Sequence, residues 1–68
     1  MKNKYNKGDK VEFKFNNEIY YGIINIVDFG TFAEPSKIQY DILCESNNTL
    51  YKHVFEEDII NKVDNKNS

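Results

Sequence analysis

The stretch GDKVEFKFNNEIYYGIINIV, residues 8–27, decides the fold class of this 68-residue chain. Its first part, KVEFKF, alternates strictly between charged and apolar residues. Such alternation is typical of a strand with one buried face. Asn16-Asn17 follows, and asparagine tolerates the left-handed backbone of a tight hairpin turn. The stretch therefore predicts two strands joined by a hairpin.

The second strand of this hairpin, EIYYGIINIVD at 18–28, is apolar on both faces. Gly22 interrupts it. A glycine inside a strand is costly unless the sheet bends or another backbone approaches closely. A strongly bent strand can serve two sheets of a small barrel, and we expect this role for the segment around Gly22.

Further short strands follow along the chain. The segment KIQYDILCE at 37–45 alternates again, SNN at 46–48 indicates a second tight turn, and TLYKHV at 49–54 indicates a fourth strand. The segment FEEDIINKV at 55–63 leaves two alternatives open. One is a 3₁₀ turn followed by a brief last strand, which its β-branched content favours, and the other is a short amphipathic helix.

These elements predict an all-β fold, a single barrel of about five short antiparallel strands with a 3₁₀ turn before the last strand. A chain of 68 residues forms one domain at most. We expect the barrel at 8–63. The polar ends, residues 1–7 and 64–68, have too few apolar residues to order themselves and are expected to be flexible.

The charge is unevenly distributed over the chain. Residues 1–14 carry five lysines against two acidic residues, whereas residues 15–68 carry four lysines against nine, which together give the formal net charge of −2. An acidic body does not attract the whole molecule to nucleic acid or to an anionic membrane. One cysteine cannot form an internal disulfide, and no apolar run suggests a membrane span or a signal peptide. We expect a cytoplasmic protein without a membrane partner.

Several motifs resemble the SH3-like barrel in its Tudor and KOW variants over about residues 8–63. They are GDKV at 8–11, YYGIINI at 20–26, YDI at 40–42 and YKHVFEEDI at 51–59. The Tudor resemblance implies recognition of methylated lysine or arginine in an aromatic cage, although Ile19 and Ser46 stand where cage aromatics usually lie. The KOW resemblance implies RNA binding. The segment YKHVFEED is also similar to small proteins of Gram-positive mobile elements, and the lysine-only basic residues suit an AT-rich bacterial coding sequence.

The sequence offers little for catalysis or metal binding. An enzyme would have to gather Cys44, His53 and a carboxylate, and a structural zinc site needs four nitrogen or sulfur ligands. The chain has one cysteine and one histidine. We therefore predict no catalytic residue, no metal and no cofactor, with a buried thiol and a surface histidine.

The aromatic residues indicate binding instead. A small barrel cannot bury all ten phenylalanine and tyrosine rings of this chain. We expect a non-enzymatic module that engages a protein or peptide partner, with a second copy of the chain as one possible partner. The predicted contact residues are exposed aromatics and an acidic turn: Tyr21, Phe29, Phe32, Tyr51, Glu56, Glu57 and Asp58. The alternative is that the loop aromatics seal one end of the barrel and the acidic turn is simply solvated.

Nucleic-acid binding of the KOW type is the second hypothesis. The same rings could stack on bases. The phosphates would be bound by the lysines of the N-terminal part: Lys2, Lys4, Lys7, Lys10 and Lys14.

Overall fold

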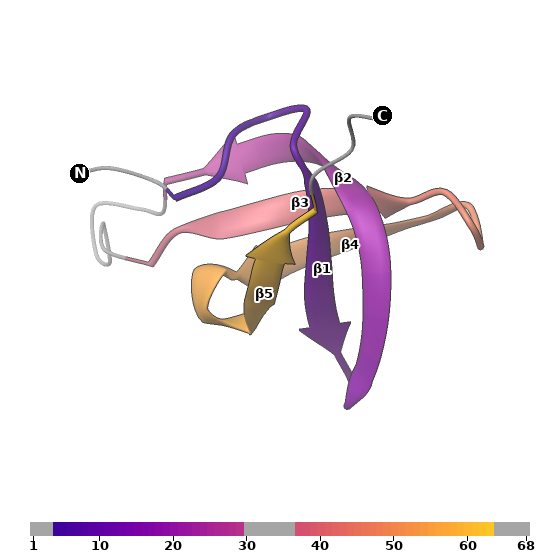
Figure 1. Ribbon diagram of the computed structural model, residues 1–68. Helices are drawn as coiled ribbons and strands as arrows, with labels where there is room; N and C mark the ends of the chain where they lie inside the picture. The colour runs from indigo at the N-terminus through magenta and orange to yellow at the C-terminus, as the bar shows by residue number, and fades with distance from the viewer. Residues whose placement is uncertain (1–3, 30–36, 64–68) are drawn as a thin grey trace.

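The fold is all-β, as the sequence predicts. The computed structural model describes residues 4–29 and 37–63 (Figure 1). It contains the strands β1 (Lys10–Phe15), β2 (Glu18–Asp28), β3 (Gln39–Cys44), β4 (Thr49–Phe55) and β5 (Ile59–Lys62), with the 3₁₀ turn η1 (Glu56–Asp58) before β5. The 3₁₀ turn and last strand are thus confirmed, and the helical alternative for 55–63 is wrong. No helix within the described ranges has the length and apolar character needed to cross a membrane.

All strand pairs are antiparallel, and the five strands form one sheet in the order β4-β3-β2-β1-β5. The sheet is strongly curved (Figure 1). Its buried core takes side chains from all five strands. Within the described ranges the hydrogen-bonded pairs do not join β4 to β5, so full closure of the barrel stays a prediction.

Alternation along the strands builds the core. Six side chains are almost fully buried: Tyr40, Phe13, Ile24, Ile42, Val11 and Cys44. On β3 every second residue belongs to this group, and the residues between them are half-buried on the outer face. The burial of the Cys44 thiol agrees with the prediction from its strand face.

The long strand β2 bends because it pairs with two strands in succession. Its first half pairs with β1, where Val11 lies opposite Gly22, and its second half pairs with β3. A Cβ atom on Gly22 would lie 2.6 Å from the Leu43 carbonyl oxygen and 2.7 Å from Ile42 Cγ2. The β3 backbone therefore approaches β2 at this residue, which is one of the two roles that the sequence suggests for the glycine.

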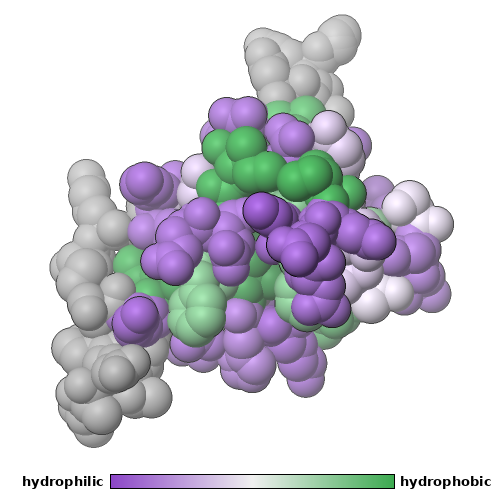
Figure 2. Space-filling model, turned by 90° about the horizontal axis from the view of Figure 1, so that it is seen from below, coloured by the Kyte–Doolittle hydropathy of each residue, from purple (hydrophilic) through white to green (hydrophobic). Residues whose placement is uncertain are grey.

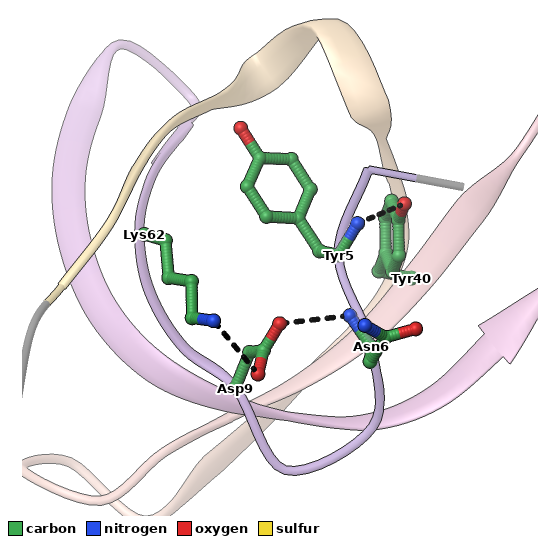
Figure 3. Close-up of polar contacts among 5 residues, drawn as sticks. All are labelled: Tyr5, Asn6, Asp9, Tyr40 and Lys62. Atoms are coloured by element: carbon green, nitrogen blue, oxygen red, sulfur yellow. Dashed lines mark hydrogen bonds and ion pairs between the residues drawn. The ribbon is translucent and has the colours of Figure 1, made fainter. Parts of the chain in front are cut away.

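The segment before β1 packs against the sheet where the structure describes it. The Tyr5 ring meets the Tyr40 ring edge-on at 5.9 Å between centroids, and the Tyr5 amide lies 3.4 Å from the Tyr40 hydroxyl (Figure 3). Asp9 accepts a hydrogen bond from the Asn6 amide at 2.9 Å and pairs with Lys62 at 3.6 Å (Figure 3). Residues 1–3 and 64–68 of the predicted flexible ends lie outside the described residues, and the flexibility of both ends stays a prediction.

The buried Tyr40 hydroxyl also connects this segment to the 3₁₀ turn. It donates a hydrogen bond to Glu56 Oε2 at 2.6 Å, and the Lys4 amide donates to the same oxygen at 2.9 Å. Burial, followed by the hydrogen bond to Glu56, raises the pKa of Tyr40 above its ordinary value. Burial of Glu56 acts to raise the pKa of its carboxyl, but the two hydrogen bonds and the Lys4 charge outweigh it, so the pKa lies below the ordinary value.

The substitution Gly22→Ala is expected to destabilise the domain. The added methyl group would overlap the Leu43 carbonyl, which belongs to the backbone and cannot rotate away. Overpacking of this kind costs about 1–3 kcal/mol of unfolding free energy, measurable by urea denaturation. Gly8→Asn measures backbone strain alone for comparison, because the Gly8 Cβ position meets no atom within 4 Å while its φ of 95° disfavours a side chain. An unchanged urea midpoint for Gly22→Ala would contradict the close approach of β3.

The Glu56 carboxylate is expected to make stability depend on pH in the acidic range. Because the folded protein lowers its pKa, ionised Glu56 stabilises the fold above the ordinary value of 4.5, and this contribution is lost as the pH falls through the lowered pKa. Glu56→Gln should cost about 1 kcal/mol at neutral pH. The difference from the parent chain should shrink on acidification, as followed by urea unfolding at several pH values.

The matched control is Glu57→Gln, which removes the same charge from the neighbouring exposed residue. This variant should follow the parent chain at every pH. Equal losses for the two variants would show that net charge matters and that the hydrogen bonds of Glu56 do not.

Candidate peptide-binding groove

A groove of about 470 Å³ lies between the β1–β2 turn and the end of β4. Its size is within the range of ligand sites in proteins. Eight residues line it: Lys14, Phe15, Asn16, Asn17, His53, Val54, Phe55 and Asp58. Figure 2 views the molecule from below Figure 1, where the β1–β2 turn lies, and shows hydrophobic side chains reaching the surface between hydrophilic ones.

The turn that forms one wall follows from its two asparagines. Phe15 of β1 pairs with Glu18 of β2, which leaves a two-residue connection. Asn16 and Asn17 have φ values of 52° and 66°. Two consecutive positive φ values are typical of the hairpin turn whose twist matches the strands. The turn predicted at these residues is therefore confirmed.

The opposite wall contains a β-bulge that the sequence did not predict. Tyr40 pairs with Val54 and Ile42 pairs with Tyr51, so two residues of β4 stand opposite Asp41. One of them is His53, with a φ of 62°.

Side chains of β3 hold this histidine in place. The His53 amide donates to Asp41 Oδ1 at 3.2 Å, and His53 Nδ1 lies 2.9 Å from Gln39 Oε1. A non-glycine residue at positive φ costs of order 1 kcal/mol and persists only where its surroundings fix it. Asn16, Asn17 and His53 are three of the four such residues in the described ranges, and all three line the groove.

Aromatic rings give the groove an apolar component. Phe15 packs on Tyr51 with 4.8 Å between ring centroids. Phe55 is 39% exposed, and Lys37 Nζ lies 5.6 Å from the centroid of its ring. Lys14 and Asp58 add one charge of each sign to the lining. The groove can thus hold an apolar side chain and distinguish charged neighbours.

Two lengths of strand edge border the groove. β4 is a terminal strand of the sheet and has β3 as its only ladder partner in the described part of the chain. β5 pairs with β1 only from Val11 to Phe13, so Lys14 and Phe15 extend beyond that ladder. A strand edge without a ladder partner is a template on which a further strand can pair.

The structure does not bring the predicted aromatic contact residues together. Tyr21 is 51% exposed on the outer face of the sheet, and Phe29 is equally exposed just after β2. Tyr51 is instead half-buried, because its register opposite buried Ile42 points it toward the core, where its ring stacks on Tyr20 with 5.0 Å between centroids. The exposure expected for Tyr51 is therefore only partial. Phe32 lies outside the described residues.

The three acidic residues of the turn have different surroundings. Glu56 is occupied by Tyr40 and the Lys4 amide, Glu57 is exposed, and Asp58 lines the groove. Of the predicted partner-contact residues that the structure describes, Asp58 alone therefore appears in the lining.

The predicted phosphate-binding lysines are spread out. Lys4 and Lys7 are exposed before β1, whereas Lys10 is half-buried and Lys14 exposed on β1 itself. Lys2 lies outside the described residues. Lys14 is the member of this group that lines the groove.

The groove also contains residues that sequence reasoning missed as a site. The sequence predicts turns at Phe55 and at the two asparagines, and a surface position for His53. The exposed position of His53 is confirmed. The bulge in β4 could not be predicted from the sequence. No residue type is specific to such a bulge, and nothing in the sequence indicates that His53 has a positive φ.

Cys44 and His53 have separate partners. The buried Cys44 Sγ lies 3.4 Å from Ser46 Oγ, and His53 Nδ1 contacts Gln39. Within residues 4–29 and 37–63, no three histidine, cysteine or acidic side chains are grouped as metal ligands.

Comparison with known proteins identifies no relative of this chain. No protein-family model, no curated protein and no solved structure matches the chain. The groove and the sheet surface therefore have to be interpreted from their own geometry.

Proposed function

We propose that this protein is a non-enzymatic binding module of the SH3-like barrel type, which holds an extended segment of a protein partner in the groove. The observation that carries the proposal is the pair of strand edges bordering the groove, at β4 and at the end of β1. An extended peptide can add a strand to such an edge and gain main-chain hydrogen bonds.

The side chains of the groove give this segment its chemistry. Phe15 and the exposed ring of Phe55 favour an apolar or aromatic residue in the peptide. Asp58, with exposed Glu57 beside it on the turn, favours a basic residue at that end. Lys14 favours an acidic or polar residue near the hairpin turn. An extended peptide with an apolar residue next to a basic one satisfies these groups.

The fixed backbone of the groove lowers the cost of binding. Ladder pairs hold the asparagine turn and the bulge, and hydrogen bonds of His53 to Asp41 and Gln39 fix the bulge further. A preformed site loses less conformational entropy on binding than one that must order. We therefore expect little backbone rearrangement in the groove when a peptide enters.

Peptide selection followed by NMR titration tests the proposal. Peptides selected from a random display library would be titrated into the ¹⁵N-labelled full chain. We expect shift changes at Lys14–Asn17 and His53–Asp58, with slower amide exchange on β4. Phe55→Ala should weaken binding about tenfold, because truncation of a central aromatic contact typically costs more than 1 kcal/mol. Phe29→Ala removes an equally large exposed ring outside the groove and should leave affinity unchanged.

Two results would contradict this function. One is that the selected peptides shift residues elsewhere and ignore the groove. The other is that short RNA or DNA binds the chain with an affinity that falls steeply with salt, which would support the lysine-based alternative. Nucleic-acid titrations at low and raised salt belong in the same experiment.

A further inference from the structure

The outer face of the sheet carries a second surface that shares no residue with the groove. Apart from the bulged Asn25, the β2 side chains that point away from the core are apolar over most of the strand: Ile19, Tyr21, Ile23 and Ile26. Three of these four are about half exposed. We call these four residues, with Leu43 and Leu50, the outer ridge.

Strand register extends the ridge sideways. Ile23 pairs with Leu43 of β3, and Leu43 pairs with Leu50 of β4. The three side chains therefore form one row on the same face of the sheet. Leu50 is 38% exposed at the end of this row. The described residues include no element that covers the ridge, since all five strands belong to the one sheet.

Charges of opposite sign flank the β2 part of the ridge, on β1 to one side and along β3 to the other. On β1 the outward residues are Lys10, Glu12 and Lys14, with a net charge of +1. On the β3 side the charged residues are Asp41 on the outer face of β3 and Glu45 just after its end, with a net charge of −2.

A hollow lies on the ridge, where β3 has ended and β2 continues. It measures about 280 Å³, and its lining includes Ile19, Tyr21, Lys10 and Glu45. Half-exposed Tyr21 thus stands beside a cavity with a cation and a carboxylate in its wall.

We propose that a second copy of the chain docks on the outer ridge, with a twofold axis that runs parallel to β2. The outer face is the convex side of a curved sheet, and two convex surfaces touch along a strip. The apolar strip on this face follows β2. A twofold contact uses the same patch on both copies. Each Tyr21 can therefore enter the hollow of the other copy.

The bordering charges select this axis. Rotation about an axis parallel to β2 exchanges the two sides of the ridge, so β1 of one copy faces β3 of the other. Lys10 then lies at the level of Leu43 of the second copy, between Asp41 and the turn residue Glu45 that follows β3. Glu12 comes near Glu45 of the second copy, but the net charge of +1 on β1 still attracts the net charge of −2 from Asp41 and Glu45. An axis across the strands would place β1 on β1 and β3 on β3, with like charges together.

Sedimentation equilibrium of the full chain over a range of concentrations tests this contact. We expect a monomer–dimer equilibrium that weakens as salt is added, since part of the attraction is between charges. Tyr21→Lys should raise the dimer dissociation constant at least about tenfold, because it places a charge at the apolar centre. Ile60→Lys is the control on exposed β5, two strands away from β2, and should leave the equilibrium unchanged.

Charge exchange identifies the partner and the axis. Lys10→Glu and Glu45→Lys should each weaken self-association, and an equimolar mixture of the two variants should associate again. Under the axis across the strands, Glu45→Lys would instead strengthen self-association, because it removes the repulsion between the two β3 strands, so a tighter dimer of this variant would overturn the proposed arrangement.

Circular dichroism and thermal unfolding verify that each variant folds. If Tyr21→Lys does not fold, Ile19→Lys at the end of the ridge takes its place, since Ile19 is 47% exposed. A parent chain that stays monomeric at every concentration in low salt, or a dimer that tolerates both lysine substitutions, would overturn the inference. Neither result bears on peptide binding in the groove, so this inference and the proposed function fail separately.

Discussion

One curved sheet has to bury its own inner face, because the described part of the chain provides no second layer to cover it. This constraint explains the features that look unusual in isolation. β2 is long because it must serve β1 and β3 in turn, and Gly22 lacks a side chain because β3 approaches there. The same curvature brings Phe13 and Phe15 of β1 to Tyr51 of β4, two strands that are not ladder partners. Aromatic packing thus joins parts of the sheet that hydrogen bonds leave apart.

Tyr40 has a comparable role at the 3₁₀ turn. A buried phenol needs a hydrogen-bond partner, and Glu56 supplies one from the turn that precedes β5. The same two residues also bind the segment before β1: the Lys4 amide donates to Glu56, and the Tyr5 ring packs on Tyr40. Three segments distant in the sequence therefore meet at one hydroxyl group. The acidic turn is thereby divided, with Glu56 serving the fold and its neighbours left on the surface.

The sequence predicted the strands well because burial on one face of a strand imposes a period of two, and that period is visible in KVEFKF and KIQYDILCE. It predicted the groove poorly because the bulges break the period. Tyr51 and Val54 both face inward although they are three residues apart, and this is possible only because Lys52 and His53 share one position opposite Asp41. If Val54 faces inward, strict alternation predicts that Tyr51 faces outward, so its inward position could not be predicted. Likewise, nothing in MKNKYNK marks Tyr5 as a partner of a residue 35 positions away.

The two proposed surfaces are compatible because of where they lie in the sheet. β2 is the middle strand of the order β4-β3-β2-β1-β5, whereas the groove lies at the edge of β4 and at the end of β1. A copy bound along the middle strand leaves the edges accessible. A dimer formed in this way would present two grooves, and a partner with two suitable segments would bind both with a higher effective affinity than either site alone provides. In a domain of this size, the strand that is too central to accept a peptide is thus the one best placed to bind a second copy.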